Sequence, residues 1–322
     1  MKAAICKRYG PPESISVVDT DIPRPRPNEI LIKVCACTVN RTDCAILTGK
    51  PWMMRLFTGL INPKIPATGT DFSGIISDTG AQVREFKTGQ EVYGFFDQGL
   101  GSHASYFCVS DDKAISVLPG GLSHDEAAAS LEGAHYAYYF IHKLKLKPGQ
   151  NALVNGATGA IGSALLQMIK HEGLKVTAVC DQAHFDQIQS YGADHLIDFT
   201  KEDFTKSGET YDFVFDAVGK SSFPKCRHIL TEKGIYISSE LGSWNQNPLF
   251  ALTTALMGGK KVIFPIPGDI KKSMQYVSGL IQKNAFRPLI DRKYPLEKIS
   301  EAFQYVASRK KIGNVLIGFE NS

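Results

Sequence analysis

The sequence has no run of about 18 consecutive apolar residues, the length that a helix needs to cross a membrane. Its charges are nearly balanced, with 36 Lys and Arg residues against 32 Asp and Glu residues. This balance, without any block of like charge, argues against nucleic-acid binding. The first nine residues also lack the apolar stretch of a secretory signal peptide. We therefore expect a globular protein that acts on small molecules, with no membrane or nucleic-acid partner.

Cysteine is sparse, with seven residues scattered along the chain and no Cys-x-x-Cys pair. Structural zinc sites need closely spaced ligands of this kind, and disulfide frameworks need an oxidising compartment. The odd number of cysteines also argues against complete pairing. We therefore expect no metal site, reduced thiols and a cytoplasmic location.

The first 122 residues show the pattern of short strands separated by glycines. Strands are expected at residues 1–7, 29–36, 71–78, 91–96 and 104–109. Many short strands with glycine turns are typical of a β-rich, barrel-like domain.

From residue 123 onward, strands alternate with helices. Ser123 followed by Glu126 is a capping-box signature, so a helix is expected to begin here. Strands are then expected at residues 152–155, 175–180, 195–198, 213–217, 234–238 and 261–264, and helices at 161–170, 185–191 and 270–283. This alternation predicts an α/β domain with a parallel, doubly wound sheet.

The end of the chain changes pattern again. Residues 295–309 carry apolar side chains at helical spacing, and residues 315–319 are expected to form a final strand. We expect this tail to return to the first domain. The predicted domains are therefore residues 1–122 with 285–322, and residues 123–284.

The strongest local signal is the glycine-rich turn GATGAIG, which separates a short apolar strand from a helix. Its first glycine permits a tight turn, its second lets a pyrophosphate approach the backbone, and its third allows the helix to pack closely on the strand. The N–H groups and dipole at the helix start then stabilise the phosphates. No Lys-Ser/Thr pair follows, so this is not a triphosphate-binding loop. The predicted dinucleotide contacts in the turn are Gly156, Thr158, Gly159, Ala160, Ile161 and Gly162.

Cys180 and Asp181 stand where the next strand ends, and this position decides between NAD and NADP. An acidic residue there would hydrogen-bond a ribose 2′-hydroxyl and favour NAD. Asp181 is close to that position, although it can equally cap the following helix. The residues by themselves favour NAD weakly.

Several segments resemble the medium-chain dehydrogenase/reductase superfamily, in its zinc-independent quinone oxidoreductase branch. They occur in the family's order along nearly the whole chain, as KAAICKRYGPPESI, PRPNEILIKVCACTVNRTD, GTDFSG, GATGAIG, YGADHLIDF, YDFVFDAVG and YPLEKISEAFQYV. RLFTGLINPK is similar to a subgroup near the reticulon-interacting mitochondrial oxidoreductase. The resemblance implies a GroES-like catalytic domain and a Rossmann nucleotide-binding domain.

The resemblance also implies NADPH-dependent reduction of a quinone or an α,β-unsaturated carbonyl by a homodimer. The superfamily's zinc enzymes have Cys and His where this chain has Asn40 and Thr70, which cannot form a zinc shell. Without a Lewis acid, a substrate that is already electrophilic fits best. Because relatives in this branch mostly prefer NADPH, we expect NADPH, with NADH as the alternative.

Site residues outside the glycine turn are implied by the same resemblance. Asn40 is expected near the reacting atoms, where its amide would hydrogen-bond a substrate carbonyl, although it can instead satisfy a local turn. Asn314 replaces a lysine that is common in relatives. The expected cofactor contacts beyond the turn are Cys180, Asp181, Val218, Gly219, Ser238, Ser239, Phe264 and Asn314.

Two other functions stay open from the sequence. The chain could bind the cofactor with little turnover, as a redox sensor or an interaction protein. Tyr139 and Lys143 also form the Tyr-x-x-x-Lys pair of short-chain dehydrogenases. That pair precedes the glycine turn here, whereas in that class it follows the turn.

Overall fold

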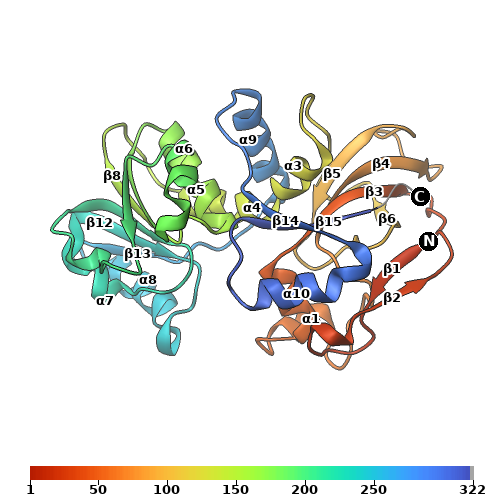
Figure 1. Ribbon diagram of the computed structural model, residues 1–322, viewed down its shortest axis with the longest axis horizontal. Coiled ribbons are helices and arrows are strands. Elements are labelled where there is room, and N and C mark those ends of the chain that lie inside the picture. Colours follow the sequence, from red (N-terminus) through yellow and green to blue (C-terminus); the bar gives the residue numbers. More distant parts are fainter. Residues whose placement is uncertain (320–322) are drawn as a thin grey trace. The chain divides into compact units, whose positions relative to one another are not determined.

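The computed structural model describes residues 1–319, which form two compact units. One unit comprises residues 1–132 and the segment from residue 290 onward, and the other comprises residues 133–289. The chain therefore leaves the first unit, completes the second and returns to the first (Figure 1). Residues 320–322 of the predicted first domain lie outside the described part of the chain.

Both boundaries between the units fall later than the predicted positions, 122/123 and 284/285. The helix α3 (His124–Ala129) stays with the first unit because Ala128 and Ala129 pack against Ala36 and Leu316. Residues after 284 stay with the second unit because the Gln167 side chain bonds both the N–H and the carbonyl of Arg287, each at 2.9 Å.

The first unit is built on a seven-stranded sheet in the order β14-β15-β3-β4-β5-β7, with β6 also pairing with β3. All these pairs are antiparallel except β14 with β15, and β1 and β2 form a separate ribbon. The expected strands of the first third are all present. The bounds are β1 (Lys2–Ile5), β2 (Ser16–Asp19), β3 (Glu29–Val39), β4 (Asp71–Thr79), β5 (Glu91–Phe95), β6 (Tyr106–Ser110), β7 (Ile115–Val117), β14 (Ile290–Pro295) and β15 (Asn314–Gly318).

Helices α1 (Arg41–Thr48), α2 (Met54–Thr58) and α10 (Ile299–Ala307) complete this unit together with α3. The predicted capping box is present at α3, where the Ser123 hydroxyl accepts the Glu126 N–H at 3.2 Å. The predicted tail helix is α10. It buries Ile299, Ala302, Phe303 and Val306 in the same apolar core as strands β3 and β15.

The second unit contains six parallel strands in the order β10-β9-β8-β11-β12-β13. In chain order this is 3-2-1-4-5-6, the arrangement of doubly wound dinucleotide-binding sheets. The strands are β8 (Asn151–Asn155), β9 (Lys175–Cys180), β10 (His195–Asp198), β11 (Tyr211–Asp216), β12 (Leu230–Ser238) and β13 (Lys261–Ile263). The helices are α4 (Glu132–Ile141), whose first residue belongs to the first unit, α5 (Ala160–His171), α6 (Phe185–Ser190), α7 (Phe223–Cys226), α8 (Gln246–Leu256) and α9 (Ile270–Gln282). The predicted fold class is confirmed.

Candidate cofactor and substrate site

The glycine-rich turn connects β8 to α5 at the carboxyl end of the parallel sheet. Gly156 has φ of +84°, and a Cβ added to it would lie 2.2 Å from Cγ1 of Val218. A Cβ on Gly162 would lie 2.1 Å from the Gly156 carbonyl oxygen. These distances are far below van der Waals contact, so the turn itself requires glycine at both positions.

Gly159 is different, because the fold does not require it. It is the N-cap of α5 with φ of −72°, and an added Cβ would make only an ordinary 3.4 Å contact with the Gly156 oxygen. The first N–H groups of an α-helix have no partner within the helix, and the helix dipole favours an anion there. The space that a side chain at Gly159 would occupy is therefore suited to a pyrophosphate.

Asp216, which the sequence analysis did not single out, organises the loop after β11. Its side chain is fully buried. Oδ1 accepts from Asn155 Nδ2 and the Gly219 N–H, both at 3.0 Å. Oδ2 accepts from the Ser221 N–H and the Tyr236 hydroxyl, both at 2.9 Å. Asp216 thus fixes the loop that carries Val218 and Gly219 to the strands on both sides of β11.

An acidic residue at the carboxyl end of an apolar strand, as in YDFVFDAVG, was the sequence signal for this role. Buried carboxylates need several hydrogen-bond donors. The backbone N–H groups of the glycine-containing loop that follows could have been identified as those donors.

The structure places the other predicted contacts of the second unit at the same edge of its sheet. Cys180 ends β9, Ser238 ends β12, and Ser239 and Phe264 follow β12 and β13. Asp181 accepts the Ala183 N–H at 2.9 Å and so caps a short 3-10 turn. Asn314 belongs to the first unit, where it begins β15 and is buried.

The first unit contains a buried polar cluster around Asn40, which precedes α1. Asn40 Nδ2 donates to the Thr38 hydroxyl at 2.5 Å and to Asp71 Oδ2 at 3.3 Å. Asp71 also accepts the Thr38 N–H at 2.7 Å and the Thr38 hydroxyl. Burial raises the pKa of Asp71 to about 8, although both bonds from Thr38 favour its charged form.

A second carboxyl, that of Glu132, is held by two threonines of the same unit. The Thr42 hydroxyl donates to it at 2.8 Å and the Thr70 hydroxyl at 3.4 Å. Burial raises the pKa of Glu132 to about 7, which the positive charge of Lys311 partly offsets. Burial in turn lowers the pKa of Lys311 to about 8.

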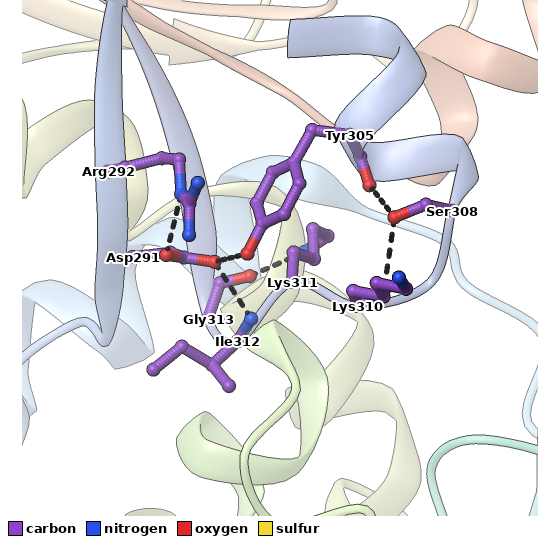
Figure 2. A network of polar contacts seen from close by, with 8 residues as sticks. All are labelled: Asp291, Arg292, Tyr305, Ser308, Lys310, Lys311, Ile312 and Gly313. Carbon is purple, nitrogen blue, oxygen red and sulfur yellow. Dashed lines mark hydrogen bonds and ion pairs between the residues drawn. The ribbon is translucent and has the colours of Figure 1, made fainter.

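Figure 2 shows how the segment that carries Lys311 is fixed. Asp291 accepts from Arg292 Nε at 3.0 Å, from the Tyr305 hydroxyl at 2.8 Å and from the Ile312 N–H at 3.0 Å. The Lys311 ammonium donates to the Gly313 carbonyl. These bonds tie the end of α10 to β14 and hold Lys311. Its positive charge lowers the pKa of Glu132, as do the bonds from the Thr42 and Thr70 hydroxyls.

A cavity of about 230 Å³ opens beside this cluster, within the first unit. Asp43, the third residue of α1, lines it, whereas Asn40 does not. Asp43 Oδ2 accepts the Asn40 N–H at 2.8 Å, so this residue braces the start of α1. The remaining lining residues are Ile46, Thr58, Pro63, Lys64, Ile65, Ala67, Thr68, Gly69, Phe96, Gln98 and Gly99.

Comparison with known proteins agrees with this architecture in both units. Residues 26–142 match the family described as alcohol dehydrogenase GroES-like domain, and residues 191–317 match the family described as zinc-binding dehydrogenase. The structure of Escherichia coli quinone oxidoreductase complexed with NADPH superposes with a TM-score of 0.80 at 24% sequence identity. It covers 99% of this chain and 100% of that chain.

Curated relatives match over most of their length. The chain is 29% identical to the 2-methylene-furan-3-one reductase of Solanum lycopersicum, over 98% of this chain and 79% of that protein. It is 28% identical to the mitochondrial NAD(P)H oxidoreductase RTN4IP1 of Mus musculus, over 90% of this chain and 82% of that protein. Because both halves match the superfamily's domains and whole-chain relatives extend over both, the chain belongs to the medium-chain dehydrogenase/reductase superfamily, in its quinone oxidoreductase-like branch.

Proposed function

We propose that this protein is an NADPH-dependent reductase that transfers hydride to a quinone or an α,β-unsaturated carbonyl. The observation that carries the proposal is the unfilled space at Gly159, at the start of α5 in a 3-2-1-4-5-6 sheet. The names of the tomato reductase and the Escherichia coli quinone oxidoreductase support the substrate class.

The chain's own residues would hold the dinucleotide along the carboxyl edge of the second unit's sheet. The turn from Gly156 to Gly162 would bind the pyrophosphate, and Val218 and Gly219 would contact a ribose. Ser238, Ser239, Phe264 and Asn314 are kept as further proposed contacts. When bound, the reduced nicotinamide supplies a hydride. The protein's task is then to orient the substrate and exclude water.

NADPH is favoured over NADH at the end of β9. One oxygen of Asp181 accepts the Ala183 N–H, so this residue caps the turn after β9, the alternative to a ribose contact that the sequence allowed. The Escherichia coli structure in complex with NADPH supports the same choice. Cys180 and Asp181 stay the proposed contacts for this end of the cofactor.

Asn40 is the proposed polar contact for the substrate carbonyl. Its bond to Asp71, at 3.3 Å, is the longer of its two, so that N–H is the one that can change partner when a substrate binds. The bond to Thr38 would then keep the amide oriented.

We propose that catalysis is independent of zinc, because the donor set does not fit this metal. The Asn40 amide donates to Thr38 and Asp71, and the Thr70 hydroxyl donates to Glu132, so neither presents a thiolate or imidazole lone pair. Among residues 1–319, no group of three or more His, Cys, Asp or Glu side chains could hold a metal ion.

An assay with two acceptors tests the proposed function. Oxidation of NADPH or NADH is followed with 1,2-naphthoquinone and with a 2-alkenal, in the presence and absence of a metal chelator. We expect turnover with both acceptors, a higher kcat/KM for NADPH, and no loss on chelation. Tight NADPH binding without turnover of either acceptor would instead favour the redox-sensor function, and loss on chelation would contradict zinc independence.

We also propose a homodimer formed through the edge of the second unit's sheet. Among the described residues, β13 is the last strand at one margin of this sheet, and an unpaired edge needs a partner or protection. Next to it, α8 exposes Leu249, Leu252 and Leu256, the last with 86% of its surface accessible. Exposed apolar surface of this kind marks an interface. A second copy of the chain could pair with the edge of β13 and cover the leucines of α8 at the same time.

Replacing Leu252 by Glu is expected to convert the dimer into a monomer, because two carboxylates would be buried against an apolar patch. Light scattering coupled to size-exclusion chromatography measures the mass. A matched variant, Leu60→Glu, changes an equally exposed leucine (68% in both) of the first unit and should stay dimeric. A wild-type monomer at micromolar concentration would contradict the proposal.

The cytoplasm is the proposed location, because all seven cysteines are free thiols. None of the helices within residues 1–319 is long and apolar enough to span a membrane.

A further inference from the structure

The cavity of the first unit contains a buried acid that the proposed hydride transfer does not use. Asp43 is only 2% exposed, and it lines this cavity. Its Oδ2 accepts the Asn40 N–H, whereas its Oδ1 is buried with no hydrogen-bond partner among the described residues. A buried polar atom without a partner costs free energy, and such atoms in native proteins commonly have a functional explanation.

The other buried polar groups on the cavity wall are already occupied. The Thr58 hydroxyl donates to the Met54 carbonyl at 2.9 Å. The Thr68 hydroxyl bonds His103 Nδ1 at 2.8 Å. The rest of the buried wall is mostly apolar. Asp43 is therefore the buried group that can serve a polar atom of a bound ligand.

Opposing effects act on the charge of Asp43. The start of α1, the Asn40 N–H and the Thr70 hydroxyl favour the carboxylate, but a helix terminus contributes at most about 2 kcal/mol. Burial raises the pKa of Asp43 well above its usual value, and the carboxylates of Glu132 and Asp71 raise it further. This direction favours the protonated acid, the form that a proton donor needs. Lys64 lies on the cavity wall, Arg41 begins the same helix, and Lys311 acts on Glu132.

We propose that Asp43 is the proton donor that completes the reduction of an α,β-unsaturated carbonyl whose reacting end enters this cavity. This role rests on the proposed function. The substrate's β-carbon gains a hydride from the reduced nicotinamide, which is thereby oxidised, and the substrate becomes an enolate. The Oδ1–H bond of Asp43 then breaks, and a bond from that proton to the enolate forms. The electron pair stays on the carboxylate, which a proton from water restores to the acid.

Asp43→Asn tests the proposal, because the amide keeps an acceptor for the Asn40 N–H but has no acidic proton. We expect kcat for a 2-alkenal to fall about 100-fold or more, the usual contribution of a general acid. The loss with 1,2-naphthoquinone should be at least about tenfold smaller, since a hydroquinone anion is far less basic than an enolate. The control is Asp97→Asn, a partly buried carboxyl next to Phe96 that does not line the cavity, and it should leave both rates unchanged.

A second readout needs no turnover. Infrared difference spectra of the substrate-free proteins, wild type minus Asp43→Asn at pH 7, should show the carbonyl stretch of a protonated carboxylic acid. A pH profile of the wild type gives a third readout and does not depend on the folding of any variant. As pH rises and Asp43 ionises, kcat for the 2-alkenal should fall more steeply than kcat for the quinone.

The outcomes separate the two proposals. Equal losses with both acceptors, or a carboxylate spectrum at pH 7, would overturn the donor role while wild-type turnover upheld the reductase. If the wild type reduces neither acceptor, the proposed function fails and the donor role fails with it.

Discussion

Gly159→Asp is expected to lower NADPH affinity at least 100-fold while leaving the fold intact. The new carboxylate would occupy the space proposed for the pyrophosphate and place a negative charge against it. Like charges in contact cost several kcal/mol, and every 1.4 kcal/mol is tenfold in affinity. The protein should still fold, because φ at Gly159 is −72° and a Cβ there meets only an ordinary contact. Calorimetric titration with NADPH gives the affinity, and circular dichroism reports the fold.

Two matched variants separate the effect of the added charge from that of added bulk at Gly159, and from that of an aspartate placed elsewhere in the protein. Gly159→Ala adds a methyl group without charge and should weaken NADPH binding much less. Gly279→Asp places the same side chain in α9, where an added Cβ meets open space, and should bind NADPH normally. Wild-type affinity in Gly159→Asp would refute the proposed dinucleotide site.

Asp216→Ala is expected to lower the free energy of unfolding by about 3 kcal/mol or more. The substitution would leave the Tyr236 hydroxyl, the Asn155 amide and backbone N–H groups without their acceptor. Each buried donor left unpaired costs about 1–3 kcal/mol. NADPH affinity should fall as well, because the loop carrying Val218 and Gly219 loses its anchor. Urea unfolding gives the stability, and titration at a temperature where the variant stays folded gives the affinity.

Asp203→Ala provides the comparison for this variant. Asp203 also caps a turn in the second unit, but it is exposed. Its Oδ1 accepts from Thr205, at 3.0 Å from the backbone N–H and 2.7 Å from the hydroxyl, and its Oδ2 lies 3.8 Å from the Lys206 ammonium. Its loss of stability should be much smaller, with NADPH affinity unchanged. Similar losses of unfolding free energy in the two variants would mean that the buried hydrogen bonds of Asp216 stabilise the protein no more than the exposed ones of Asp203.

Much of the second unit could be predicted because its signals are local. The strands at residues 175–180 and 195–198 occur where the apolar runs predicted them. The turn GATGAIG can be recognised from sequence, because neighbouring atoms lie too close to Gly156 and Gly162 for a side chain to fit at either position. Strand ends are harder to predict than strand positions: β12 begins at Leu230, four residues before its predicted start. Pairing with β11 extends that strand, and pairing is not visible in sequence.

The polar cluster of the first unit could not be predicted, because its members are far apart in the chain. Asp43, Glu132 and Lys311 come from α1, the start of α4 and the segment before β15. Asn40 was identified by resemblance, but the bonds that orient its amide depend on Asp71 from another strand. That Asp43 has one oxygen bonded and one unpaired is a property of packing, which no local pattern encodes.

The strand order of the first unit has a consequence for synthesis on the ribosome. β15, which ends at Gly318, is inserted between β14 and β3 rather than added at a free margin of the sheet. Residues 133–289 contain all the strands of their own sheet, so they can reach their native state as soon as they emerge. The amino-terminal strands, although made first, cannot complete their sheet until residues 314–318 have been synthesised.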